Sequence, residues 1–224
     1  MKRSELNKIM KDAVAFINEM NFKLPPFAFW SPDDWATKGK DYNEIRDNML
    51  GWDITDFGSG DYLKEGLLMF TLRNGNFNDK SYVKPYAEKL LIVEENQITP
   101  YHFHWSKMED IINRGGGDLV VQVYNSTKDE KFADTDVDIY KDGYHYIVKA
   151  GDTVRIKPGE SISIQSGMYH QFWAEGGKTL LGEVSKVNDD RVDNRFYKEV
   201  GRFPAIEEDE KPLYLLGNEY PEAK

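Results

Sequence analysis

The sequence TPYHFHWSKMED, residues 99–110, contains two histidines that stand two positions apart. Side chains alternate between the two faces of a β-strand, so His102 and His104 point to the same face if the stretch is extended. Tyr101, Phe103 and Trp105 then occupy the opposite face. An isolated pair of this kind is more often a solvated strand face than a metal site. Residues farther along the chain are therefore needed to distinguish a metal site from a solvated strand face.

A carboxylate and a third histidine stand at set distances from this pair. The chain reads His-x-His, four residues, Glu109, six residues and Gly116, and later Gly159, five residues, Gln165, one residue, Gly167, two residues and His170. Imidazole nitrogens and a carboxylate oxygen suit Mn, Fe, Co, Ni or Zn. Such a set leaves one or two coordination positions open for water or substrate, as a catalytic site requires. The spacing predicts a metal site at His102, His104, Glu109 and His170.

Short strand-like segments recur through the middle of the chain, from about residue 66 to residue 187. They cover residues 67–72, 86–93, 98–105, 119–125, 144–149, 152–156, 161–165, 170–174 and 179–187, with turns at 115–117, 142–143, 158–159 and 176–177. Residues 106–112 are ambiguous. Such a series predicts an all-β sandwich or barrel. The fourth histidine, His145, falls in a predicted hairpin outside both histidine stretches, and we interpret it as a surface or structural residue.

The two ends of the chain have other patterns. An apolar stripe predicts a helix over residues 4–20, and three prolines predict an extended arm over residues 21–32. A short helix over 32–37 and a loop containing Trp52 and Asp53 follow. The polar tail, residues 188–224, is expected to wrap the barrel. We therefore predict one domain over 1–224, with helix and arm in about 1–65, the barrel in about 66–187 and the tail in about 188–224.

The composition excludes several classes of function. The chain has no cysteine, which excludes disulfides and thiolate chemistry and fits a cytoplasmic protein. The net charge of −10, with scattered Lys and Arg, argues against nucleic acid or an anionic membrane as partner. No apolar run approaches the roughly 20 residues that span a bilayer. We expect a small-molecule ligand and no nucleic-acid or membrane partner.

The two histidine stretches resemble, in the correct order, the two sequence motifs of the cupin superfamily. This chain departs from the usual second motif at Gln165, where proline is common, and at Ala174, where asparagine is common. Neither position holds a metal ligand in that superfamily. The resemblance covers about residues 85–187. It implies a cupin-type β-barrel of the jelly-roll kind, extended here by an N-terminal helix and arm and a C-terminal wrapping tail.

Four longer strings resemble a more particular family. They are MNFKLPPFAFW (20–30), DNMLGWDITD (47–56), TPYHFHWSKMED (99–110) and YHQFWAE (169–175). Together they resemble the bacterial D-lyxose isomerases, a cupin family of sugar ketol-isomerases, over nearly the whole chain. The resemblance implies interconversion of D-lyxose with D-xylulose, and also of D-mannose with D-fructose. It further implies a divalent ion, with manganese first and zinc, cobalt or nickel as alternatives, on the four ligands that the spacing had already selected.

Moving a proton between two sugar carbons requires a base on one face of the sugar. Glu109 is a poor base if it binds the metal, so we consider Lys107 as the group that shuttles the hydroxyl proton or stabilises the enediolate. Glu207, in an acidic run beside an apolar segment of the tail, is our candidate for the carboxylate base. The alternative is that this run is a solvated acidic turn.

Other residues are candidates for binding the sugar. Asp190 and Arg195 follow the last predicted strand and either bind hydroxyl groups or lie in a solvated loop. Phe29 and Trp30 either form an apolar wall against the sugar or pack within the arm or at a dimer contact. Because of the aromatic residues in the arm, we expect a homodimer. In the predicted strand 86–93, only one of the neighbours Glu88 and Lys89 can face inward, and the sequence leaves open which.

Two other functions remain compatible with the sequence. The first is another metal-dependent cupin enzyme, either a dioxygenase or a phosphosugar isomerase, although the acidic charge and the lack of a cationic cluster disfavour a phosphorylated substrate. The second is a non-catalytic sugar-binding cupin, which would bind without turnover.

Overall fold

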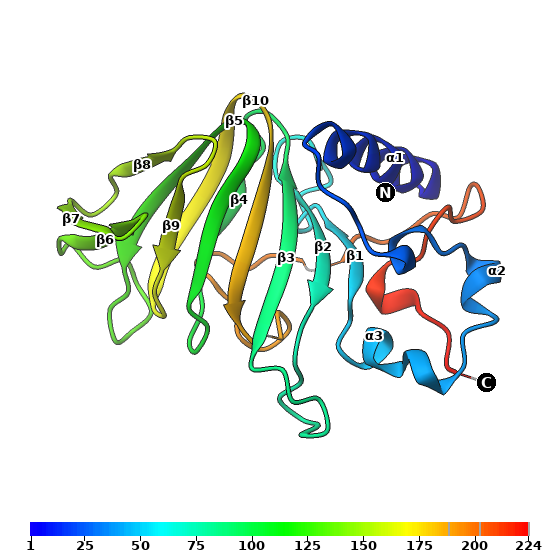
Figure 1. Cartoon of the computed structure of the whole chain (residues 1–224). Helices are drawn as coiled ribbons and strands as arrows, with labels where there is room; N and C mark the ends of the chain where they lie inside the picture. Colours follow the sequence, from blue (N-terminus) through cyan, green and yellow to red (C-terminus); the bar gives the residue numbers. More distant parts are fainter. Residues whose placement is uncertain (188, 202, 224) are drawn as a thin grey trace.

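The computed structural model describes residues 1–187, 189–201 and 203–223, and consists mainly of β-strands with a few short helices (Figure 1). The helices are α1 (Arg3–Glu19), α2 (Pro32–Trp35) and α3 (Asn43–Asp47), with 3₁₀ turns at Pro26–Phe29, Lys40–Tyr42 and Gly217–Glu219. The strands are β1 (Gly51–Thr55), β2 (Leu67–Arg73), β3 (Tyr86–Val93), β4 (Thr99–Phe103), β5 (Glu109–Asn125), β6 (Val137–Lys141), β7 (Tyr144–Val148), β8 (Thr153–Ile156), β9 (Ser161–Ile164), β10 (Met168–Lys186) and β11 (Arg195–Phe196). The predicted all-β class is confirmed.

Two long antiparallel strands, β5 and β10, pair with each other along most of their lengths and connect the two halves of the sheet. The first half has the order β1-β2-β3-β10-β5-β9-β6-β7 and uses the N-terminal part of β5 and the C-terminal part of β10. In the second half, β4 pairs with the N-terminal part of β10, β8 pairs with the C-terminal part of β5, and β11 pairs with β4. Apolar side chains of both halves, including Leu91, Val121 and Phe172, meet in one core. Among the described residues the sheet is not closed, since β1 and β7 stand at its ends.

Three sequence predictions about strands were wrong. The glycines at 115–117 and 176–177 do not end strands but lie inside β5 and β10, where the register between the two shifts. Positive φ angles, such as +96° at Gly116 and +131° at Gly177, let the chain bend there without breaking the pairing. Residues 51–55 form β1 instead of a loop, and β6 was not predicted, although Val137 and Ile139 alternate with exposed residues as in a half-buried strand.

A layer of helix and arm covers the outer face of β1, β2 and β3 (Figure 1). Leu6, Met10, Ala13 and Ile17 form the buried stripe of α1, at the spacing that places side chains on one helix face. They pack in one cluster with outward-facing strand residues such as Phe70. The helix predicted from the apolar stripe is therefore confirmed, and it leaves the inner face of the same strands free for the site.

The tail runs back along this layer. The backbone nitrogen of Met1 donates to the carbonyl of Ala205 at 2.9 Å, and the buried guanidinium of Arg3 pairs with Glu208 and Glu219. The rings of Tyr220 and Trp35 stack with centroids 4.0 Å apart. Among the described residues, no helix is long and apolar enough to cross a membrane.

Candidate metal centre

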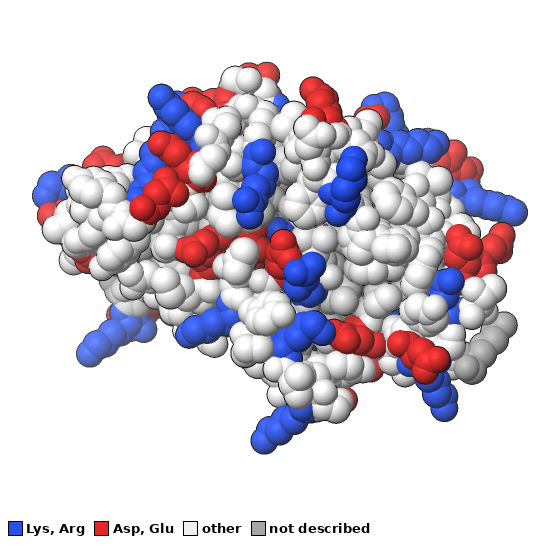
Figure 2. All heavy atoms as spheres, in the orientation of Figure 1, with Lys and Arg blue, Asp and Glu red and all other residues white. Residues whose placement is uncertain are grey.

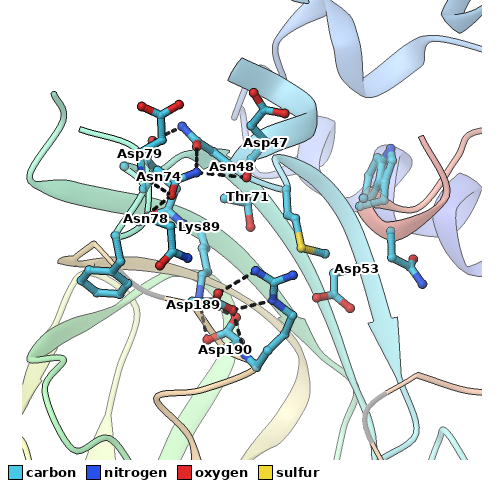
Figure 3. Close-up of a pocket in the computed structure, with 18 of the residues that line it drawn as sticks. Asp47, Asn48, Asp53, Thr71, Asn74, Asn78, Asp79, Lys89, Asp189 and Asp190 are labelled. Atoms are coloured by element: carbon cyan, nitrogen blue, oxygen red, sulfur yellow. Dashed lines mark hydrogen bonds and ion pairs between the residues drawn. The ribbon is translucent and has the colours of Figure 1, made fainter. Parts of the chain in front are cut away.

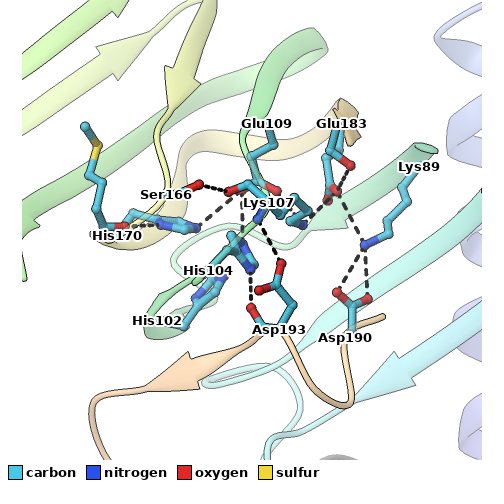
Figure 4. A network of polar contacts seen from close by, with 12 residues as sticks. Lys89, His102, His104, Lys107, Glu109, Ser166, His170, Glu183, Asp190 and Asp193 are labelled. Carbon is cyan, nitrogen blue, oxygen red and sulfur yellow. Dashed lines mark hydrogen bonds and ion pairs between the residues drawn. The ribbon is translucent and has the colours of Figure 1, made fainter. Parts of the chain in front are cut away.

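Four buried ligand groups meet where the two halves of the sheet face each other (Figure 4). His102 lies on β4 directly opposite His170 on β10, and their ring centroids are 4.1 Å apart. His104 follows the end of β4, and the nitrogens of the three histidines that could bind a metal all lie within 4.8 Å of one another. Glu109 is the first residue of β5, and its Oε1 lies 3.5 Å from Nε2 of both His104 and His170.

Backbone carbonyls orient each imidazole. The Nδ1 atoms of His102, His104 and His170 lie 2.9, 3.0 and 3.0 Å from the carbonyl oxygens of Pro100, Asp193 and Met168. A carbonyl oxygen can only accept a hydrogen bond, so Nδ1 carries the proton in each ring and Nε2 has a free lone pair. Outer hydrogen bonds of this kind orient metal-binding histidines in proteins.

Among the described residues, Nε2 of His104 and of His170 are buried without a hydrogen-bond partner. A buried polar atom in that state is unfavourable unless a ligand satisfies it. Burial lowers the pKa of His170 to about 4, and burial together with His170 and His104 holds the pKa of His102 well below its ordinary range. Both rings are therefore neutral at pH 7, as metal coordination requires. Three neutral imidazoles and a carboxylate fit a divalent transition metal.

A chain of ionic groups extends from the histidines into the sheet (Figure 4). Nζ of Lys107 lies 2.5 Å from Oε2 of Glu109 and 3.0 Å from Oε1 of Glu183. Nζ of Lys89 lies 3.4 Å from the same oxygen of Glu183 and 3.0 Å from Oδ2 of Asp190. Burial alone would lower the pKa of Lys107, but Glu109 and Glu183 together raise it above its ordinary range. Lys107 is therefore a permanent cation at neutral pH.

Asp193 connects the tail to this arrangement. Its two carboxylate oxygens each accept a hydrogen bond of 2.9 Å, from the backbone nitrogens of Ser106 and Lys107. Its carbonyl oxygen is the partner of His104. One buried residue thus fixes both the ring of His104 and the start of the Lys107 loop.

A small cavity of ≈ 40 Å³, which we call the inner cavity, adjoins the ligands. Polar and charged side chains from several strands line it together with the apolar Phe172 and Phe196. The ionisable residues among the described lining are Lys89, His102, His104, Lys107, Glu109, Glu183 and Asp190. The arrangement therefore combines a group that could hold a metal ion, a buried cation and further carboxylates, which are the components that metal-assisted proton transfer requires.

The sequence is similar to those of known sugar isomerases. The sequence model of the D-lyxose isomerase family matches residues 1–220. The chain belongs to this family. It is 46% identical to the D-lyxose/D-mannose isomerases of Escherichia coli O157:H7 and of Serratia proteamaculans, over 98% of each chain. These relatives place it among the aldose–ketose sugar isomerases.

Solved structures extend the comparison to the fold. The L-ribose isomerase of Cellulomonas parahominis, in complex with L-psicose, is similar over 92% of this chain and 98% of its own, with a TM-score of 0.62 and 16% identity. The L-ribose isomerase of Acinetobacter sp. DL28 in complex with L-ribose has a TM-score of 0.60 and 14% identity over the same shares. At such identities the likeness shows the fold alone, which this chain shares with the two L-ribose isomerases.

The structure brings six of the sequence-selected residues together. His102, His104, Glu109 and His170 converge, and Lys107 and Asp190 line the same inner cavity. The choice between Glu88 and Lys89 is also resolved. Lys89 faces inward and is 2% exposed, whereas Glu88 faces outward and pairs with Arg73 at 3.0 Å. His145 is exposed and pairs with Asp138, as expected for a surface residue.

The other four candidates lie elsewhere. Glu207 is exposed, and its backbone pairs with Met1 and Arg3 at the start of α1. Arg195 pairs with Glu130, and Phe29 packs edge-on against Tyr214. Trp30 packs against Trp35 and Tyr42 within the arm. None of the four is among the described residues that line the inner cavity.

Sequence reasoning missed Glu183 and Asp193. Glu183 had a usable signal, because it occupies an inward position between the inward residues Leu181 and Ser185 of a predicted strand. A carboxylate among the buried, inward-facing residues of a strand is a candidate functional group. Asp193 had no comparable signal, because the nitrogens that it binds are 86 and 87 residues away in sequence.

Proposed function

We propose that this protein interconverts D-lyxose with D-xylulose and D-mannose with D-fructose, using a divalent metal ion, with manganese as the first candidate. The observation that carries the proposal is the set of three imidazoles with carbonyl-bound Nδ1 and inward Nε2, beside Glu109. Membership of the D-lyxose isomerase family supports the choice of sugars.

His102, His104, Glu109 and His170 would hold the ion. Two imidazole nitrogens without partners and a buried carboxylate form a donor set that suits manganese, zinc, cobalt or nickel. When bound, the ion would supply Lewis-acid polarisation of the sugar oxygens at C1 and C2. We assign the proton transfer and the balancing of charge to side chains of the protein.

We assign the carbon-to-carbon proton transfer to Glu183 in place of Glu207. Glu183 lines the inner cavity, is 4% exposed and is not one of the four proposed metal ligands. Its carboxylate would take the proton from C2 of the aldose, and the electron pair of that C–H bond would form the C1–C2 double bond of a cis-enediol as O1 gains a proton. Returning the proton from Glu183 to C1, with loss of the hydroxyl proton at O2, gives the ketose.

Lys107 supports this transfer as a cation. Its ammonium contacts Glu109 and Glu183 and is buried, so its charge acts in a region of low dielectric constant. Its fixed charge can balance the negative charge that develops on O1 and O2 while the hydroxyl proton passes from O2 to O1. Asp190 stays our candidate for binding a sugar hydroxyl. Glu207, Arg195, Phe29 and Trp30, and the homodimer, stay predictions that this mechanism does not use.

The proposal is tested by comparing two histidine variants. His170→Ala removes an inward ligand and should lose most of the bound manganese and of the conversion of D-lyxose to D-xylulose. His145→Ala, the matched control on an exposed strand, should retain both. Oxygen consumption measured in parallel separates isomerase from dioxygenase chemistry. An active protein whose activity falls equally in the two variants would contradict the proposed centre.

A further inference from the structure

A second and larger cavity, which we call the outer cavity, adjoins the metal centre (Figure 3). It measures ≈ 270 Å³, against ≈ 40 Å³ for the inner cavity. Lys89 and Asp190 line both cavities, so the outer one lies directly beside the ionic groups of the site. The inner cavity alone holds a few water molecules, whereas the outer one is close to the roughly 300 Å³ at which small-molecule pockets begin.

The lining of the outer cavity is rich in amide and carboxylate groups. It includes Asp47, Asn48, Asp53, Asn74, Asn76 and Asn78. Amides donate and accept hydrogen bonds and carboxylates accept them, which matches hydroxyl groups that do both. Trp52, Phe77 and Phe203 add apolar surface to the lining. This mixture suits a molecule with many hydroxyl groups on a carbon chain.

The charges of the outer cavity argue against an ionic ligand. The two cationic residues of its described lining make ion pairs, Lys89 with Asp190 at 3.0 Å and Arg191 with Asp189 at 2.6 Å. A phosphate would face the remaining carboxylates. Within the described part of the chain, the three histidines of the inner site are the only group of ligand atoms close enough together to hold a metal ion. A neutral ligand is therefore favoured over an anion or a cation.

Thr71 is a nearly buried polar residue in the lining of this cavity. It lies on β2 opposite Lys89, lines the outer cavity and is 8% exposed (Figure 3). A hydroxyl group both donates and accepts hydrogen bonds, so that of Thr71 could pair with a hydroxyl group of a bound ligand.

We propose that the outer cavity binds the hydroxyl-bearing chain of a neutral sugar or polyol, beside the metal centre. This inference rests on the proposed function and adds to it the place where the sugar is recognised. It also predicts that the substrate is unphosphorylated, since no unpaired cation among the described lining residues could receive a phosphate group.

The probe for this site is D-arabitol, the reduced form of D-lyxose, which has the hydroxyl groups but no carbonyl to isomerise. Calorimetric titration of the metal-free full chain should detect binding. Thr71→Val removes one hydroxyl at nearly constant volume and should weaken binding about five-fold, the effect of one lost hydrogen bond. Asn218→Trp, at an exposed lining position, should block the cavity without touching the core. Thr153→Val, on the exposed side of β8, is the control.

In the manganese-loaded enzyme, Thr71→Val and Asn218→Trp should raise KM for D-lyxose while leaving kcat near the wild-type value, because the contact is made equally before and during the reaction. Unchanged D-arabitol affinity in both variants would overturn the proposal, as would competition by inorganic phosphate. If the wild-type protein isomerises D-lyxose but does not bind D-arabitol, this inference alone is overturned. Intact D-arabitol binding without isomerisation would overturn only the proposed function.

Discussion

At the scale of single residues, the site depends on the direction in which each polar atom points. That the four proposed ligands lie close together could be predicted from the sequence, because their spacing and the alternation along one strand place them on common faces. The partners that orient them could not. His104 is held by the carbonyl of Asp193, 89 residues away, and Glu183 meets Lys107 across 76 residues. Such contacts depend on the tertiary fold and leave no local pattern in the sequence.

The assignment of Glu183 as the base leads to a kinetic prediction. Glu183→Gln keeps the size of the side chain and removes its ability to accept a proton, so kcat for D-lyxose should fall by about 10²–10⁴-fold. Because Glu183 contacts Lys107 and Lys89 but is not a proposed metal ligand, manganese content should stay at the wild-type level. Glu207→Gln, in the exposed tail, is the matched control and should leave kcat unchanged. The reverse pattern would restore Glu207 as the base.

At the scale of elements, the continuity of β5 and β10 decides how the site is assembled. Each strand contributes to both halves of the sheet, and β10 carries His170 in one half and Glu183 in the other. The sequence predicted most strands because apolar residues alternate in them. It placed strand ends at the glycine runs 115–117 and 176–177, because a glycine run indicates a turn unless long-range pairing continues through it. The bend is therefore a tertiary feature that local signals cannot separate from a turn.

Two glycine variants test the importance of this bend. At Gly116, where φ is +96°, an added Cβ would lie 2.1 Å from the backbone oxygen of Lys178. Gly116→Ala should therefore lower the free energy of unfolding by about 3 kcal/mol or more, since backbone has to move. Gly176 also has a positive φ but nothing within 4 Å, so Gly176→Ala should cost only about 1 kcal/mol. Urea denaturation measures both values, and equal losses would contradict the close approach of the two strands.

At the scale of the whole molecule, the segments outside the central strands hold the site in place. The helix and arm cover the outer face of β1 to β3, so the inner face of the same strands can present Thr71 and Lys89 to the cavities. The first part of the tail supplies Asp190 and Asp193 to the site, and its later part returns to the N-terminus through Arg3. Figure 2 shows acidic and basic side chains interspersed over the face viewed, without a continuous basic surface, in keeping with a neutral ligand.

We propose that a metal ion held by three histidines and Glu109 allows this protein to isomerise an unphosphorylated sugar. The most direct test is to remove metal from the full chain with a chelator, restore manganese, and follow D-lyxose in heavy water. We predict no D-xylulose from the metal-free protein, recovery of turnover with manganese, and solvent deuterium on C1 of the ketose, because the proton on Glu183 can exchange with solvent before it is returned. Undiminished turnover without metal, or no ketose with manganese, zinc, cobalt or nickel, would contradict the claim.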